Sequence, residues 1–246
     1  MTTEFIFVAN LLLLLRLRLL LADTVVGWRG WLAKGVIELA ALALFEPHPF
    51  LIGAGLTTMA FNIGAAYWER RASSRHGGRL LFGALQLAAL SFWFSAAGGV
   101  QFRAVLAEWA QSLEAWSSLG GELTRLMGRD GLRVVLGGLL AANEANLLVR
   151  WLLLRLHIKP GTGGAGAAID ANEFNRGRVI GLLERALIYA FVLSGQYGAI
   201  GFTLAAKGFT RFKELENRAF AEYVLIGTLL SSSLALAAGW WVKFAN

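Results

Sequence analysis

The polar residues that could bind a ligand or form a buried ion pair lie inside apolar stretches of this chain. In the segment GGLLAANEANLLVRW, Asn143, Glu144 and Asn146 fall near the middle of an otherwise apolar run. A charged carboxylate at the centre of a bilayer costs at least ~2.5 kcal/mol, so we expect Glu144 to be neutralised, paired or in contact with water. Asn143 and Asn146 share one helical face with Arg150, whereas Glu144 projects from another face. The partner of Glu144 is therefore expected to come from a different helix.

Cations in other apolar segments are the expected partners: Lys207, Arg185 or Arg18. Lys207 lies eleven residues after Gln196, or three helical turns, so the two residues share a face. Glu184 lies about 120° around the helix from Gln196 and does not join that face. One hypothesis is a polar strip, facing Glu144, that handles a ligand. The other is a buried pair that only fixes helix packing.

Polar residues also occur singly in other spans, as Glu38, Asn62 and Gln86, and each alone carries little weight.

No pattern of residues indicates catalysis, a metal ion or a cofactor. The chain has no cysteine, no Gly-x-Ser-x-Gly motif, and only three widely separated histidines, His48, His76 and His157. Residues 161–166 match the dinucleotide fingerprint Gly-x-Gly-x-x-Gly, but they follow an apolar helix and Pro160 rather than a strand. We expect a flexible linker there, no bound cofactor or metal, and no enzymatic activity.

The composition indicates a membrane protein. Hydrophobic residues make up 57% of the chain, charged residues make up 16%, and the mean hydropathy is +0.57. A soluble domain of this size needs more charge on its surface. The net charge of +7 comes from cations at the ends of apolar runs, which is typical of membrane topology and anionic lipid rather than nucleic acid.

The apolar runs predict a polytopic all-α bundle of six or seven transmembrane helices in a single membrane domain, 1–246. The first span is expected either to cross with Arg16 and Arg18 snorkelling or to lie at the interface. The expected spans are 5–26, 30–45, 50–68, 80–100, 132–154, 179–206 and 219–241.

Basic loops predict the topology of these spans. Residues 69–79 and the Gly-rich linker 159–178 are expected on the cytoplasmic side, and the amphipathic helical loop 101–130 on the outside. The segment 179–206 is expected to cross as one helix. In the alternative, it re-enters at residues 195–198 and never crosses.

Small residues predict a close contact between the last two spans. Gly195, Gly198 and Gly201 surround Gln196 in one span. The next span repeats a small residue every four positions, at Gly227, Ser231, Ala235 and Gly239. Such faces allow helix backbones to approach closely, so we expect these spans to pack together.

The amino-acid sequence of the C-terminal part is similar to that of a known family. GRVIGLLERALIYAFVLSGQYGAIGFTLAAKGFTRF and the later AEYVLIGTLLSSSLALAAG resemble a bacterial family of small polytopic membrane proteins, classed as a domain of unknown function. The resemblance is most specific over 177–239 and extends more weakly to NEANLLVRWLLLRLHI. It implies a multi-pass protein of the bacterial cytoplasmic (inner) membrane, and it implies no activity or catalytic residues.

Two functions are therefore expected. The first is binding or passage of a small ion, a solute or a lipid headgroup at a polar site between helices, formed by Glu144, Asn143, Asn146, Gln196, Lys207, Glu184 and Arg185. The alternative is a non-catalytic scaffold that holds a membrane or peripheral protein partner, or a second copy of the chain. The lipid bilayer is the expected partner in both cases.

Overall fold

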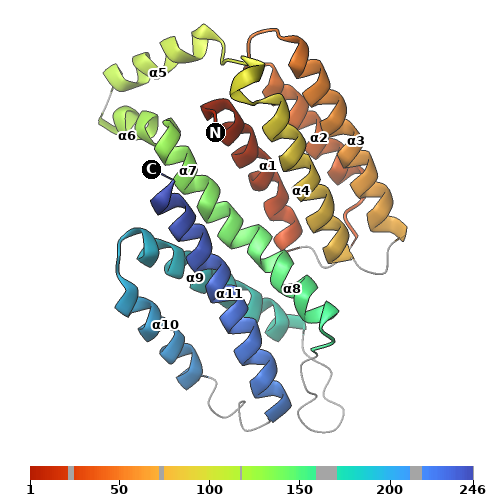
Figure 1. The fold of residues 1–246 in the computed structure, drawn as a ribbon, viewed down its shortest axis with the longest axis vertical. Coiled ribbons are helices and arrows are strands. Elements are labelled where there is room, and N and C mark those ends of the chain that lie inside the picture. Colours follow the sequence, from red (N-terminus) through yellow and green to blue (C-terminus); the bar gives the residue numbers. More distant parts are fainter. Residues whose placement is uncertain (22–24, 72–74, 117, 159–170, 211–217, 246) are drawn as a thin grey trace. The chain divides into compact units, whose positions relative to one another are not determined.

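The computed structural model describes residues 1–21, 25–71, 75–116, 118–158, 171–210 and 218–245, and the regular elements in these ranges are helices (Figure 1). An isolated antiparallel bridge joins Phe45 and Phe102, and the described residues form no β-strand. The prediction of an all-α fold is confirmed. The chain divides into two compact units, Met1–Leu139 and Leu140–Asn246. Whether the two units form the expected single membrane domain, 1–246, depends on how they associate. That expectation stays a prediction.

The first unit is built around α1–α4 and α7. In this unit α3 packs against α2 and α4, and α1 packs against α7, α4 and α2. Pro49 opens α3, where a helix tolerates the missing N–H, so the EPHP segment ends one helix and begins the next. The elements are α1 (Thr3–Leu21), α2 (Trp28–Leu42), α3 (Pro49–Arg71), α4 (Arg75–Trp93), η1 (Ala96–Gly98), α5 (Ala104–Trp116), α6 (Ser118–Met127) and α7 (Arg129–Leu139).

The second unit is built around α9 and α11, which pack against each other along much of their length. Helix α8 also contacts α11, and α10 contacts α9. A short π-helical segment, η2, precedes α8 and contacts both α9 and α11. The elements are η2 (Leu140–Glu144), α8 (Ala145–Arg155), α9 (Ala171–Leu193), α10 (Tyr197–Thr210) and α11 (Arg218–Phe244).

Three of the described helices are long and apolar enough to cross a membrane: Pro49–Arg71, Arg129–Arg155 and Phe220–Phe244. They correspond to the expected spans 50–68, 132–154 and 219–241. Helix length and hydropathy therefore support a membrane protein, but they do not support six or seven spans.

The expectation of one continuous helix over 179–206 is wrong. Helix α9 ends at Leu193 and α10 begins at Tyr197. Gly195 between them has a positive φ of 72°, which glycine adopts without steric cost. The Gln196 N–H donates to Phe191 O (2.8 Å) and the Gly195 N–H to Val192 O (3.2 Å), which is the Schellman pattern of a helix end. The break falls where the re-entrant alternative placed it.

One polar segment is more helical than expected, and a second is helical as expected. Residues 171–178 belong to α9, although they were assigned to the linker 159–178, and the rest of that linker with its glycine motif lies outside the described residues. The amphipathic loop 101–130 contains α5 and α6, and Trp109 on α5 is 68% exposed. The sides of the membrane on which these segments lie remain predictions.

The small-residue face of α11 packs as expected, but against α9 rather than α10. Ala235 is completely buried in a cluster with Ile188 and Val192 of α9. A Cβ added at Gly239 would lie 2.7 Å from Val192 Cγ1, so the helices are in close contact there. Added Cβ atoms at Gly198 and Gly201 of α10 would meet nothing within 4 Å. The glycines around Gln196 therefore play no part in this contact.

We expect Gly239→Ala to lower the free energy of unfolding by about 1–3 kcal/mol, because the new methyl group overfills the α9–α11 contact. Gly227→Ala on the same helix is the matched control, since its Cβ would lie 3.8 Å from Leu153 Cδ1, an ordinary contact. The control is expected to be neutral or stabilising by about 0.5–1 kcal/mol. Thermal unfolding in detergent measures both, and equal melting temperatures would contradict the packing.

Candidate functional site

The interior of the first unit contains four polar side chains that hydrogen-bond to one another. We call Lys34, Glu38, Asn62 and Gln86 the α2–α4 polar cluster; each is less than 9% exposed. The Lys34 ammonium donates to Glu38 Oε1 (2.6 Å), Asn62 Oδ1 (2.7 Å) and Gln86 Oε1 (3.2 Å). The Asn62 and Gln86 amides donate to Glu38 Oε2, at 2.6 and 3.3 Å. The cluster therefore joins three helices through one cation and one carboxylate.

The helices place these four side chains by periodicity and close approach. Lys34 and Glu38 are one turn apart on α2, so both point from the same face. Gly35 lies between them, and a Cβ added there would be 3.5 Å from Asn62 Nδ2. Gly35 therefore lies in ordinary contact with Asn62 of α3, which reaches the ion pair from that helix, while α4 supplies Gln86.

The positive charge of Lys34 and the negative charge of Glu38 cancel, and hydrogen bonds within the cluster satisfy both groups. A buried ion pair is tolerated only where further hydrogen bonds serve the remaining lone pairs and protons. Here the ammonium uses its three protons on three oxygens, and both carboxylate oxygens accept bonds. The arrangement holds a single positive charge inside a shell of oxygen atoms.

Apolar side chains cover the outside of the same three helices. Buried positions of α2, α3 and α4 hold the polar cluster, which reverses the usual distribution in a soluble protein. An apolar exterior around a polar interior is what helices in lipid require. The side chains that form this exterior, between 43% and 68% exposed, are Leu32, Val36, Ile52, Leu56, Ile63, Leu81, Leu85 and Phe92.

A second charged cluster joins α1, α3 and α4 in the first unit. Arg79 pairs with Glu69 at 2.5 Å, and Glu69 Oε1 also accepts a bond from the Val26 N–H at 3.0 Å. Arg16 donates to Arg79 O at 2.8 Å and is only 2% exposed. Arg16 therefore finds its partner inside the bundle instead of extending outward, and whether the first span crosses or lies at the interface stays a prediction. Arg18 is exposed.

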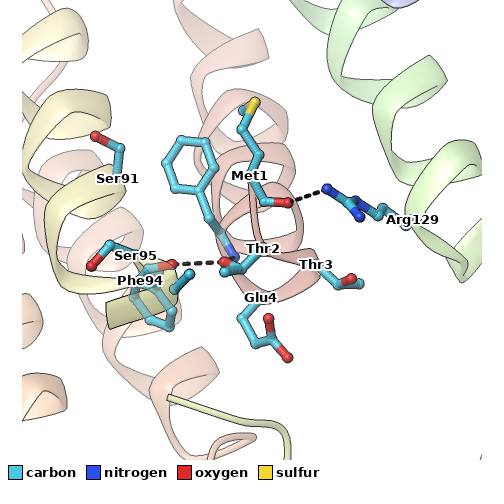
Figure 2. Close-up of a pocket in the computed structure, with 10 residues that line it drawn as sticks. Met1, Thr2, Thr3, Glu4, Ser91, Phe94, Ser95 and Arg129 are labelled. Atoms are coloured by element: carbon cyan, nitrogen blue, oxygen red, sulfur yellow. Dashed lines mark hydrogen bonds between the residues drawn. The ribbon is translucent and has the colours of Figure 1, made fainter. Parts of the chain in front are cut away.

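An open pocket of about 750 Å³ lies where α1, α4, η1 and α7 meet (Figure 2). Two hydrogen bonds flank it in Figure 2: Thr2 Oγ1 donates to Phe94 O at 2.6 Å, and Arg129 donates to Met1 O at 2.9 Å. Glu4 adds a carboxylate to its lining. No sequence pattern pointed to this pocket, since its walls come from distant segments.

The second unit does not assemble the predicted polar strip. Lys207 pairs with Glu184, the residue that was expected to lie on a different face. Gln196 is exposed in the turn before α10. Helix α10 folds back along α9, so a helical wheel drawn through both cannot place their side chains. Glu144 accepts a bond from Asn143 Nδ2 at 3.1 Å.

Arg185 is buried in the second unit and is held by neutral oxygens. Its guanidinium donates to Ala142 O and to Ser231 Oγ, each at 3.2 Å. Ala142 lies in the π-helical segment η2, where the widened turn alters the usual i→i−4 bonding. Asn143 and Asn146 are buried nearby in the sequence, as expected for inward-facing polar residues. The predicted residues are thus divided between the Glu184–Lys207 pair, the Arg185 contacts, the hydrogen-bonded Asn143 and Glu144 with buried Asn146, and the exposed turn at Gln196.

Lys34 is the residue that sequence reasoning missed. Its spacing of four residues from Glu38 within an apolar run was the available signal, because such a pair can neutralise itself on one helix face. Asn62 and Gln86 can be recognised as part of a site only from the fold, which brings both side chains to this pair.

Fold and site together define a helical protein with three helices able to cross a membrane and a buried polar cluster between α2, α3 and α4. Within the described ranges, no group of three or more His, Cys, Asp or Glu residues is placed to hold a metal ion. Comparisons with protein-family models, with curated proteins and with solved structures find no match to this chain.

Proposed function

We propose that this chain is a multi-pass protein of the bacterial cytoplasmic membrane with six or seven membrane segments. The apolar exteriors of α2 and α4 support segments beyond the three longest apolar helices, because exposed Leu32, Val36, Leu81 and Leu85 suit lipid better than water. The segment 179–206 enters as the broken pair α9–α10. The resemblance over 177–239 supports the bacterial location.

The proposed role is the binding or passage of a small cation at the α2–α4 polar cluster. One observation carries it: inside an apolar exterior, three helices direct three oxygen atoms at a single positive charge. Ionisable groups buried in membrane segments commonly mark ion pathways, since their insertion is costly. The proposed site therefore lies in the first unit, rather than at Glu144, Gln196 and Lys207.

The contacts of the small-residue face on α11 argue against the scaffold alternative. Ala235 and Gly239 of that face are occupied by α9 within the same chain, so they offer no free surface to a partner. The amphipathic helix α5, with exposed Trp109, is one surface among the described residues that is open to a protein partner.

Gln86→Leu tests the proposed role, because it removes one oxygen from the cluster and leaves the Lys34–Glu38 pair intact. Purified protein in proteoliposomes is assayed for uptake of potassium, sodium and ammonium ions. We expect uptake of at least one cation by the unaltered protein and about a tenfold or larger loss in the variant, as for a lost hydrogen bond to a charged group.

Gln111→Leu on α5 is the matched control and should keep full uptake, because Gln111 is exposed and far along the chain from the cluster. Absence of uptake and of cation binding in the unaltered protein would reject the role and leave the scaffold alternative.

A further inference from the structure

The oxygen atoms around Lys34 form a shell with the composition of a cation site. One carboxylate oxygen and two amide oxygens, from Glu38, Asn62 and Gln86, lie 2.6, 2.7 and 3.2 Å from Lys34 Nζ. Oxygen donors of these kinds bind alkali and alkaline-earth cations, and do not favour softer metals. A single carboxylate balances one positive charge, so the shell suits a monovalent cation better than a divalent one.

The size of the shell selects among monovalent cations. An ammonium group and a potassium ion have nearly equal radii, whereas a sodium ion is smaller and needs shorter contacts to oxygen. Because the three contacts are set for an ammonium nitrogen, a free ammonium or potassium ion could take the same position without moving the helices.

An aromatic ring lies beside the oxygen shell. The Cα–Cβ bond of a helical residue points toward the N-terminus of its helix, which is the side on which Trp31 lies on α2. Lys34 Nζ is 5.9 Å from the Trp31 ring centroid, within the range of a cation–π contact. The Trp31 ring thus adds a cation–π attraction to the three oxygens around this position.

We infer that the cation handled by this protein is monovalent and of ammonium or potassium size, and that the Lys34 ammonium is a tethered substitute occupying its position. This inference rests on the proposed function of the α2–α4 polar cluster and names its substrate class.

Lys34→Met tests the inference, because methionine keeps most of the lysine stem and lacks the ammonium. The vacated position is then lined by three oxygens, and the Glu38 charge has no cation beside it. Thermal unfolding of the purified variant is measured at one pH and one ionic strength in potassium, ammonium, sodium or choline chloride. Potassium and ammonium should each raise the melting temperature by about 5 °C or more over choline when present at about 100 times the dissociation constant. Sodium should raise it less.

A second variant, Lys34→Met with Glu38→Gln, removes the negative charge and should melt at the same temperature in all four salts. Equal melting of Lys34→Met in all four salts would overturn the inference, as would stabilisation that favours sodium. If uptake by the unaltered protein remains sensitive to Gln86→Leu in that case, the proposed function stands and only the substrate class is wrong. If uptake is also absent, both fail.

Discussion

Lys34→Met is expected to lower the free energy of unfolding by about 3–5 kcal/mol when choline is the only cation present, because it leaves Glu38 buried without its charge partner. Glu38 is only 8% exposed, so water cannot take the place of the ammonium without opening the bundle. The remaining donors to Glu38 are the neutral amides of Asn62 and Gln86. Thermal unfolding in detergent, followed by circular dichroism, measures the loss.

Arg29→Met is the matched control on the same helix, since Arg29 is exposed and its replacement is expected to cost no more than about 0.5 kcal/mol. Adding Glu38→Gln to Lys34→Met should recover most of the lost stability, because no charge is then left buried. A double variant no more stable than Lys34→Met would show that the loss comes from packing rather than from the charge on Glu38.

Arg79→Met is expected to have an effect of similar size, about 3–5 kcal/mol, through the second charged cluster. Glu69 is 4% exposed and accepts from the Arg79 guanidinium and the Val26 N–H. Without Arg79, only the Val26 N–H remains of these two donors to Glu69. One backbone hydrogen bond does not offset the cost of burying a carboxylate. Chemical and thermal unfolding of the purified variant measure the loss.

The control for Arg79→Met is Arg70→Met, which removes an exposed guanidinium from the residue next to Glu69 and should change stability by no more than about 0.5 kcal/mol. Combining Arg79→Met with Glu69→Gln should restore much of the lost stability. Equal stability of Arg79→Met and Arg70→Met would mean that the Glu69 carboxylate does not depend on its partner.

Helix positions followed from sequence where local signals mark them. The expected span 50–68 lies within α3, because Pro49 fixes one end and the charged residues Arg70 and Arg71 mark the other. The expected span 132–154 lies within Arg129–Arg155, because arginine residues mark both ends of that apolar run. The break at Gly195 was placed only by the re-entrant alternative and not by the favoured continuous span, because hydropathy does not register one glycine that takes a positive φ.

The site residues were harder to predict because their partners come from distant parts of the chain. The cost of burying a charge identified Glu144 and Lys207 as residues that need partners, and Lys207 does have one. Its partner, Glu184, could not be chosen from helical periodicity, since α10 reverses direction after Gly195. Lys34 was missed because Asn62 and Gln86 are 28 and 52 residues away from it.

In the proposed membrane arrangement, the spacing of Lys34 and Glu38 on α2 bears on how the chain is inserted during synthesis. Helices enter the bilayer from the translocation channel one or a few at a time, and each must be acceptable to lipid before its later neighbours exist. Because the two charges are four residues apart, α2 can form its own neutral pair as soon as it is helical. Asn62 and Gln86 then join when α3 and α4 arrive. Glu69 must instead wait for Arg79 on the following helix, so in the proposed membrane arrangement the release of α3 into lipid depends on that of α4.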